Sequence, residues 1–345
     1  MSPRRALYWR RRQKIPLIPF VEREAMHKVW RNPGYSIRLF DPRGHYPAGK
    51  IAAPNALYWG APDLTFMATW SAPWDWYKLD MPYTEMDWAT PQELKLLASI
   101  LLCEREDGPR TCFYPVHRFS MRLDAEKLNL ESPWIATRIK DSIIERSHRP
   151  DMMIGEGAIL ECRKGKYSLF KKSCLEIARQ PEFFERISTD DYLFLRGIGA
   201  LLKADMLTRH YEFWEEAIVI SFIALEASFQ MVLRELRQSG IVEPTSKDAA
   251  AWLHQSFNEP FGLEPVERYF QAVYDQRIMT LHPVSRLGVN PYAPLFHDDY
   301  SLLRRDVPSI FAYLLTGRHS PEYLTTIARF GKTNSNRAGG QERKE

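Results

Sequence analysis

Apolar residues follow a helical period most clearly between residues 211 and 237. They occupy positions 214, 217, 218, 221, 222, 225, 228, 229, 232 and 236. A stripe with a period of 3.6 residues over about seven turns predicts one long amphipathic helix. Ser239-Gly240 directly after the stripe is a normal C-terminal stop for a helix. The pattern therefore predicts that this is the strongest helix of the chain.

Helical patterns continue on both sides of this long helix, over most of the chain after about residue 181. Residues 189–207 predict a helix with Thr189 as its N-cap, and Ser246 is expected to cap a shorter one. A helix starting near Pro265 runs into YDQRIMTLHP, residues 274–283, and two more helices cover 297–315 and 321–330. Pro308 is expected to kink or restart the first of these two. The C-terminal part is thus predicted to be all-helical.

The first 130 residues have a different character. Seven of the ten tryptophans precede residue 90, amid many prolines, which is typical of short strands and loops. Thr90-Pro91 begins a helix there, with Glu93 completing a capping box, and residues 110–123 predict a strand. Gly44–Ile51 matches the opening of a phosphate-binding loop, but Ile51 lacks the required hydroxyl and Pro54 opposes a following helix. A turn between short strands is expected at that position.

The overall prediction is an α+β protein. A Trp/Pro-rich mixed α+β domain of unknown role, residues 16–185, follows a basic tail at 1–15. An all-α domain covers 186–331, and the polar, glycine-rich residues 332–345 are expected to be a disordered tail. The tryptophans are expected to fill the core of the first domain rather than to stack on unpaired bases, although the Arg-rich tail leaves the second interpretation open.

Composition narrows the function only slightly. Of the 345 residues 45% are hydrophobic and 26% are charged, as in ordinary globular proteins, and the net charge of +4 permits a nucleic-acid partner without requiring one. The four cysteines show no metal-ligand spacing, so neither a metal nor a cofactor is predicted, and a reducing cytoplasm is the expected location. The longest uncharged apolar run, 217–225, is too short for a membrane span. The Arg-rich N-terminus leaves an organellar transit peptide as the alternative destination.

The segment YDQRIMTLHP carries the candidate chemistry. On a helix that begins at Val266, the apolar positions 266, 269, 270 and 273 place Arg277 on the same buried stripe. A buried guanidinium needs an acceptor, and Glu226 in the apolar stretch FIALEASF is the nearest candidate by pattern. Pro283 forces the helix to end at His282, where the helix dipole favours a protonated imidazole. The pattern fits a structural Arg277–Glu226 pair and a functional Arg277/His282 pair alike.

A family resemblance favours the second interpretation. The long helix with Ala224-Leu225-Glu226, a linking helix, a helix that ends in R-x4-H and a further helix at 298–315 resemble the HEPN superfamily, especially its Apea-like branch, over residues 185–320. The R-x4-6-H spacing also occurs at Arg38–His45 and Arg110–His117. The place of Arg277–His282 in the order of helices distinguishes it from these two.

This resemblance implies a metal-independent endoribonuclease of toxin or defence type, with RNA as substrate and a homodimer as the active form. His282 would act in proton transfer and Arg277 would stabilise the phosphate. The alternative is a non-catalytic HEPN-like interaction or dimerisation module in which Arg277–Glu226 is structural. Ile278 and Pro283 depart from the polar residue and the glycine common at these positions in the family.

Overall fold

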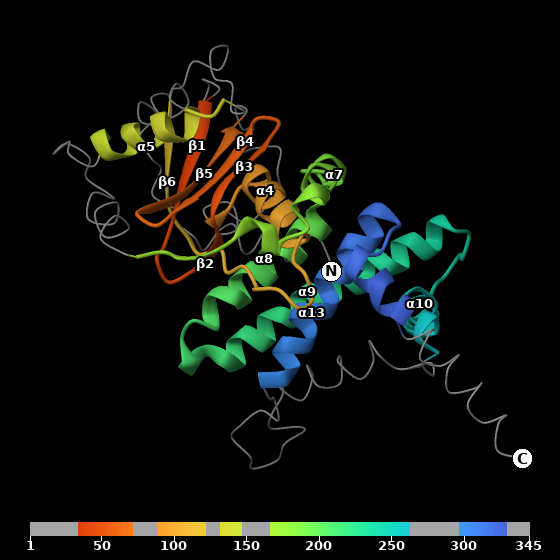
Figure 1. Cartoon of the computed structure of the whole chain (residues 1–345). Coiled ribbons are helices and arrows are strands. Elements are labelled where there is room, and N and C mark those ends of the chain that lie inside the picture. The colour runs from red at the N-terminus through yellow and green to blue at the C-terminus, as the bar shows by residue number, and fades with distance from the viewer. Residues whose placement is uncertain (1–33, 72–87, 122–131, 147–165, 263–296, 330–345) are drawn as a thin grey trace, which may run out of the picture.

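A five-stranded antiparallel sheet forms the N-terminal part of the protein. The computed structural model describes residues 34–71, 88–121, 132–146, 166–262 and 297–329. The strands of the sheet are β1 (Gly34–Phe40), β3 (Gly49–Ala53), β4 (Ala56–Ala61), β5 (Leu64–Ser71) and β6 (Pro115–Met121). Their order is β3-β4-β5-β1-β6, with every neighbouring pair antiparallel (Figure 1). Strand β6 confirms the central part of the strand predicted at 110–123.

The two faces of the sheet pack against different helices, and strand β1 shows the division. Tyr35, Ile37 and Leu39 belong to a core cluster with the buried residues of α5 (Ile135–Arg146). The alternate residues Ser36 and Arg38 reach the opposite face, where they contact α4 (Pro91–Leu101). Because side chains alternate along a strand, a register shift of one residue would exchange the two sets.

Helix α4 is fixed to the sheet by a buried ion pair. Nη2 of Arg38 lies 3.0 Å from Oε2 of Glu93, and both side chains are almost completely buried. Glu93 also accepts a 2.9 Å bond from the amide of Thr90, whose hydroxyl accepts from the amide of Glu93 in return. The predicted capping box is confirmed, and Glu93 both caps the helix and neutralises a buried arginine.

A second, two-stranded sheet lies beside the first. Strand β2 (His45–Pro47) pairs in parallel with β7 (Ser168–Phe170). Gly49, with a φ of 91°, connects β2 to β3 in a conformation that favours glycine. Gly44–Ile51 therefore contains the short strand β2, a connection at Ala48 and the start of β3, and strand β4 rather than a helix follows it.

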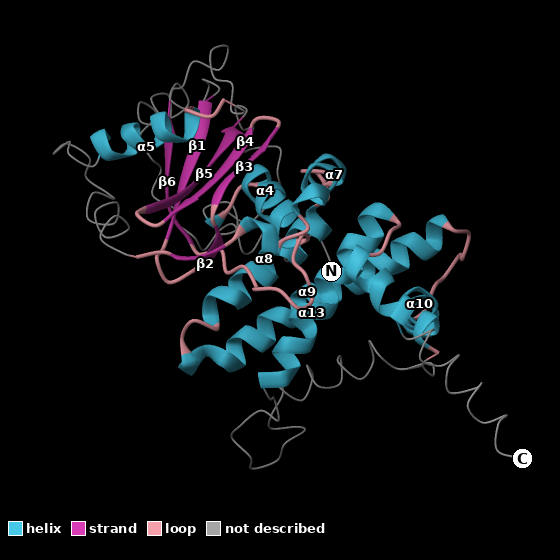
Figure 2. Ribbon diagram, in the orientation of Figure 1, coloured by secondary structure: helices cyan, strands magenta, loops and turns pink. Residues whose placement is uncertain are grey.

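Helices make up the rest of the described chain. They are α7 (Gln180–Arg186), α8 (Tyr192–Leu207), α9 (Trp214–Gln238), α10 (Ser246–Leu253), α13 (His297–Thr316) and the helical segment 321–329. Helix α9 runs through the middle of this part and contacts α8, α10 and α13 (Figure 2). Packing on several sides explains why Ala224, Ala227 and Met231, outside the predicted stripe, are also buried.

The long helix at 211–237 is confirmed, but two of the predicted N-caps are wrong. Asp191, not Thr189, caps α8, and its carboxylate accepts from the amide of Phe194 at 3.2 Å. Thr245, not Ser246, caps α10 through a capping box with Asp248. Pro308 lies inside α13, so of the two predicted outcomes the restart of the helix does not occur. Each cap is one or two residues from the expected position because a second capping residue stands next to the first.

The sheet and the helices share one core. A single cluster contains Phe40 and Tyr58 from the sheet, Leu97 from α4, Phe222 from α9 and Phe311 from α13. The α+β class expected from the sequence is confirmed. The predicted boundary at 185/186 falls at the end of α7, and buried residues on both sides of it belong to this cluster. Residues 1–15 and 332–345 lie outside the described residues.

One stretch, Tyr211–Gln238, is long and apolar enough to cross a membrane by length and composition. Of its most apolar window 61% is buried inside the molecule, as in the central helix of a folded core. It is therefore weak evidence for a membrane span.

Two glycines of α8 test this packing. A Cβ on Gly197 would lie 2.6 Å from Cζ of Phe311 and 2.9 Å from Cβ of Ala227, whereas one on Gly199 would lie 3.7 Å from Trp88. We expect Gly197→Ala to lower the free energy of unfolding by about 1–3 kcal/mol, despite the better helix propensity of alanine. Gly199→Ala, the matched control, should leave it unchanged or raise it by up to about 1 kcal/mol. Urea unfolding measures both, and equal effects of the two would contradict the close approach of α8, α9 and α13.

Candidate functional site

The predicted catalytic residues Arg277 and His282 lie in segment 263–296, outside the described residues. Glu226 is described, and it lies half-buried on α9 with its carboxylate accepting a 3.0 Å bond from Nε2 of Gln230. The competing R-x4-6-H match at Arg38–His45 is not helical: Arg38 is buried in strand β1 and His45 lies in strand β2. Neither Arg110 nor His117 of the third match is helical either.

A buried charge network joins α13 to α8 and to the loop after α4. Arg304 of α13 is 3% exposed, and its Nε donates to both carboxylate oxygens of Asp205 at 2.7 and 3.0 Å. Its Nη1 and Nη2 donate to the two oxygens of Glu104 at 2.9 and 3.0 Å. The hydroxyl of Tyr300 donates to Asp205 as well. A single guanidinium therefore binds two carboxylates that come from distant parts of the chain.

Further contacts complete the network. Nη1 of Arg110 lies 3.4 Å from Glu104, so this carboxylate has a second cation beside it in addition to Arg304. The amide and hydroxyl of Thr111 donate to the same Glu104 oxygen at 2.7 and 2.5 Å. Burial raises the pKa of Asp205, and the charge and hydrogen bonds of Arg304 oppose this rise. Burial and the nearby Asp205 also raise the pKa of Tyr300, which keeps its phenol as a donor at neutral pH.

An open cleft of about 740 Å³ lies beside the network, and we call it the Arg209 cleft. Its lining includes Thr208 and Arg209 from the end of α8, Trp214 at the start of α9 and Ser301 near the start of α13. Cys112, Asp205, Asp298, Arg304 and Arg305 also line it. The volume is within the range of sites that hold small molecules or parts of a polymer.

Arg209 is the chemically distinctive residue of this cleft. Its side chain is exposed, and no carboxylate of the described chain lies within ion-pair distance of it. Cys112, whose thiol donates to the backbone carbonyl of Asp205 at 3.4 Å, lines the same cleft. A planar, permanently charged guanidinium that is not paired with a carboxylate can bind a phosphate through two parallel hydrogen bonds.

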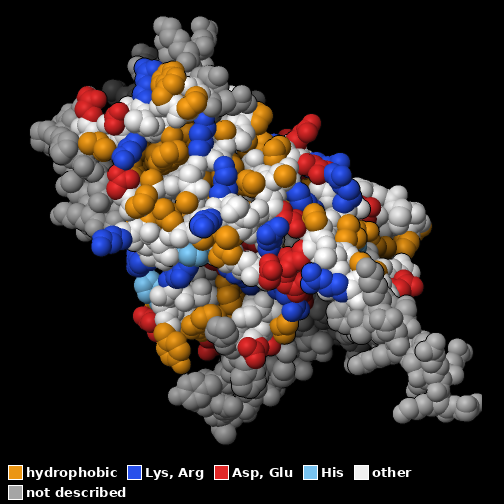
Figure 3. All heavy atoms as spheres, viewed as in Figure 1, with side chains coloured by type: hydrophobic (Ala, Val, Ile, Leu, Met, Phe, Trp, Pro, Cys, Tyr) orange, Lys and Arg blue, Asp and Glu red, His pale blue; other side chains and the backbone are white. Residues whose placement is uncertain are grey.

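Histidine side chains and another arginine lie beside Arg209. Burial, and then the charge of Arg209, lower the pKa of His45, so its ring is neutral at pH 7. Nδ1 of His45 lies 2.7 Å from Oγ of Ser168. Nε2 of His210 lies 3.4 Å from Nη1 of Arg43, which is itself paired with Asp41 at 2.9 Å. Figure 3 shows histidines among Lys and Arg side chains at the lower left of this face, and a group of carboxylates flanked by basic side chains at its centre.

The cleft is not arranged for thiol chemistry. Burial raises the pKa of Cys112 to about 11, and the charge of Asp205 adds to the effect. The thiol is therefore protonated at neutral pH and is a poor nucleophile. Among the residues that the structure describes, no group of three His, Cys, Asp or Glu side chains is placed to hold a metal ion. Binding of an anion through Arg209 is the chemistry that the described residues support.

The described tryptophans of the N-terminal part have packing roles. Trp59 and Trp70 pack against the cluster between the sheet and α5, and Trp88 packs against the main core. Trp214, which follows later in the chain, meets Tyr300 edge-on with ring centroids 5.4 Å apart, at the wall of the Arg209 cleft. An aromatic ring and Arg209 therefore line the same cleft.

Comparisons with known proteins give no relative for this chain. No protein-family model, no curated protein and no solved structure matches it. The functional argument therefore depends on the residues themselves and on the order of the helices.

Substitution of Arg304 tests whether the network is structural. Arg304→Met should lower the free energy of unfolding by about 3–5 kcal/mol, because it leaves Asp205 and Glu104 buried without their shared cation. Arg305→Ala is the matched control: its side chain is 44% exposed and pairs with the adjacent Asp306, so the loss should stay below about 1 kcal/mol. Chemical denaturation gives both values. A small effect of Arg304→Met would show that the carboxylates do not depend on this guanidinium.

Proposed function

We propose that this protein binds RNA and cleaves it without a metal ion, as a cytoplasmic ribonuclease of HEPN type that acts as a homodimer. The single observation that carries the RNA partner is Arg209: an exposed arginine, without a carboxylate partner in the described chain, at an open cleft with an aromatic wall. RNA offers both a phosphate for the guanidinium and unpaired bases for the aromatic ring.

The order of helices supports the catalytic half of the proposal. Helix α9 carries Ala224-Leu225-Glu226, α10 follows it, and α13 comes after segment 263–296. This is the order that the resemblance implies around the Arg/His pair. Helix α13 also packs on α9, so the helices that precede and follow the segment belong to one layer.

The proposed reaction is an internal transesterification. The 2′-hydroxyl of a ribose attacks the adjacent phosphorus and loses its proton, while the 5′-oxygen of the next nucleotide leaves and gains one. His282 serves in this proton transfer, and Arg277 stabilises the charge that develops on the phosphoryl oxygens. The products are a 2′,3′-cyclic phosphate and a 5′-hydroxyl. Arg209 would bind a neighbouring phosphate and so hold the strand across the site.

The alternative, a non-catalytic interaction or dimerisation module, is favoured by the position of Glu226. Its carboxylate is half-buried between the buried residues Leu225 and Ala227 of α9. An arginine such as Arg277 that neutralised it would be a structural partner rather than a catalytic residue. The two proposals differ in whether the chain cleaves RNA.

Cleavage is tested on the purified full chain. We expect single-stranded RNA labelled at its 5′ end to be cut in EDTA, and His282→Ala to slow the cut by about 10²–10⁴-fold because it removes a proton-transfer group. Arg277→Lys should also be slow, since lysine does not reproduce the planar fork. Circular dichroism confirms that the variants fold. Absence of cleavage by the unmodified chain would favour the interaction module, and equal rates in His282→Ala would place the catalytic residues elsewhere.

Binding is tested separately in the His282→Ala background, where the RNA stays intact. We expect Arg209→Ala to reduce the slope of log Kd against log salt by about 1, because one phosphate contact is lost. Arg237→Ala is the control: it is exposed at the far end of α9, roughly 35 Å along the helix from Trp214. An unchanged salt slope in Arg209→Ala would remove the Arg209 cleft from the RNA-binding surface.

A further inference from the structure

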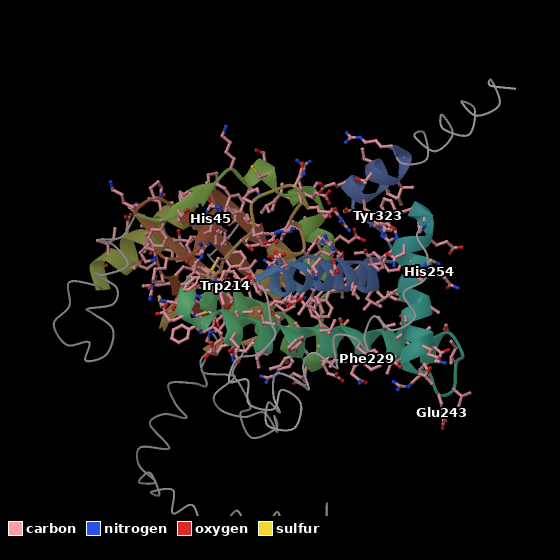
Figure 4. All side chains as sticks on the ribbon, turned by 90° about the horizontal axis from the view of Figure 1, so that it is seen from below. His45, Trp214, Phe229, Glu243, His254 and Tyr323 are labelled. Atoms are coloured by element: carbon pink, nitrogen blue, oxygen red, sulfur yellow. The ribbon has the colours of Figure 1, made fainter. Side chains whose placement is uncertain are left out.

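A second cavity, of about 500 Å³, lies along the C-terminal half of α13. We call it the Tyr323 cavity, and its aromatic wall consists of Phe257, Phe261, His319 and Tyr323. Figure 4 shows Tyr323 and His254 near one end of the helical part, and His45 and Trp214 near the other. The cavity therefore extends away from the Arg209 cleft, with which it shares only the lining residues Arg110 and Arg305.

The aromatic wall is a stack with parallel faces. The ring of His319 lies 4.0 Å from that of Tyr323, with an interplanar angle of 22°, and 4.5 Å from that of Tyr313, with an angle of 29°. Phe261 meets Tyr323 edge-on at 5.2 Å. Burial lowers the pKa of His319, so its ring is neutral at pH 7 and stacks without a charge. Tyr313 and Tyr323 thus cover both faces of His319, and a further planar ring would extend this stack beyond Tyr323, because stacking tolerates many ring types.

A π-helical turn, His254–Asn258, positions the other side of the wall. The phenol of Tyr323 donates to the backbone carbonyl of Phe257 at 2.8 Å, which ties segment 321–329 to this turn. Wider π-turns leave carbonyls without their usual helical donors, and they occur often at functional sites. The aromatic rings are therefore held in place by backbone contacts before any ligand binds.

Arginines surround the opening of the cavity. Arg110, Arg179, Arg305 and Arg318 line it, against the carboxylates of Glu104, Glu106 and Asp306. Each of these arginines has a carboxylate partner, which is Glu104 for Arg110, Glu176 for Arg179, Asp306 for Arg305 and Glu182 for Arg318. Arg318 is 67% exposed and pairs with Glu182 at the surface. Exposed pairs of this kind contribute little free energy, so Arg318 can turn to a stronger anionic partner.

We infer that the Tyr323 cavity binds a mononucleotide, with its base on the aromatic wall and its phosphate at the arginines of the opening. The volume lies within the range of small-molecule sites, and the apolar residues Leu101, Leu253 and Ile310 form the remaining wall. A nucleotide combines the planar ring and the negative charge that this lining requires. The inference goes beyond ribonuclease activity. A mononucleotide has no internucleotide phosphodiester bond, so it would be a ligand of this cavity and not a substrate of Arg277 and His282.

Titration calorimetry on the full chain tests this inference with AMP, GMP, CMP and UMP, the four nucleosides and inorganic phosphate. At least one nucleotide should bind, with its nucleoside and phosphate each about tenfold weaker or more. Phe261→Ala should raise the nucleotide Kd about tenfold through the lost stacking. Arg318→Gln should weaken the nucleotide but not its nucleoside, and this exposed variant poses little risk to folding.

Arg186→Gln is the matched control, since Arg186 pairs with the same Glu182 at 3.2 Å but does not line the cavity. It should leave nucleotide binding unchanged. Absence of binding by every nucleotide at millimolar concentration would overturn the inference, as would equal behaviour of Arg318→Gln and Arg186→Gln. Tight binding of phosphate alone would identify an anion site without base recognition and would overturn it too.

Discussion

The buried guanidinium of Arg304 fixes the relative positions of α4, α8 and α13. It donates to Asp205 at the end of α8 and to Glu104 just after α4, so it holds elements from both the sheet-containing and the helical parts. Each of these buried charges would be costly alone, and only the complete set is balanced. Both cavities border this set, because Arg110 and Arg305 line the Arg209 cleft and the Tyr323 cavity alike. The shape of either site therefore depends on the same network.

A second buried arginine, together with Arg304, attaches α4 to its neighbours near both of its ends. Arg38 of β1 binds Glu93 in the first turn of α4, and Arg304 binds Glu104 three residues after its last turn. The helix is thus held at its start by the sheet and beyond its end by α13. The two attachments lie beside the main core cluster, to which the α4 side of the sheet and the helices contribute, whereas a separate cluster lies between the sheet and α5. Ion pairs give these contacts direction, whereas apolar packing alone would permit the parts to shift against each other.

The sequence predicted those features whose interacting residues are close together along the chain. The capping box of Thr90 and Glu93 was predictable because its donors and acceptors lie within four residues, and α9 because its apolar period persists over many turns. The Arg304 network was missed because its partners are 99 and 200 residues away. A signal for it did exist. Tyr300, Leu303, Val307 and Phe311 form an apolar stripe that places Arg304 on the buried face, the same argument that drew attention to Arg277. That argument identifies an inward arginine but does not identify its acceptor.

Arg209 differs from the other arginines of its cleft, because they are paired with carboxylates. In the Arg209 cleft, Arg304 is bound by two buried carboxylates, Arg110 by Glu104 and Arg305 by Asp306. An anion that approached Arg304 would have to displace a buried carboxylate and leave it without its cation, which is costly. No carboxylate of the described part of the chain lies within ion-pair distance of Arg209, although Asp205 and Asp298 also line the cleft, and the neutral ring of His45 does not compete for the anion as a second cation. A chain with a net charge of only +4 can therefore direct an anionic partner to the Arg209 cleft, because local pairing as well as total charge decides where a phosphate binds.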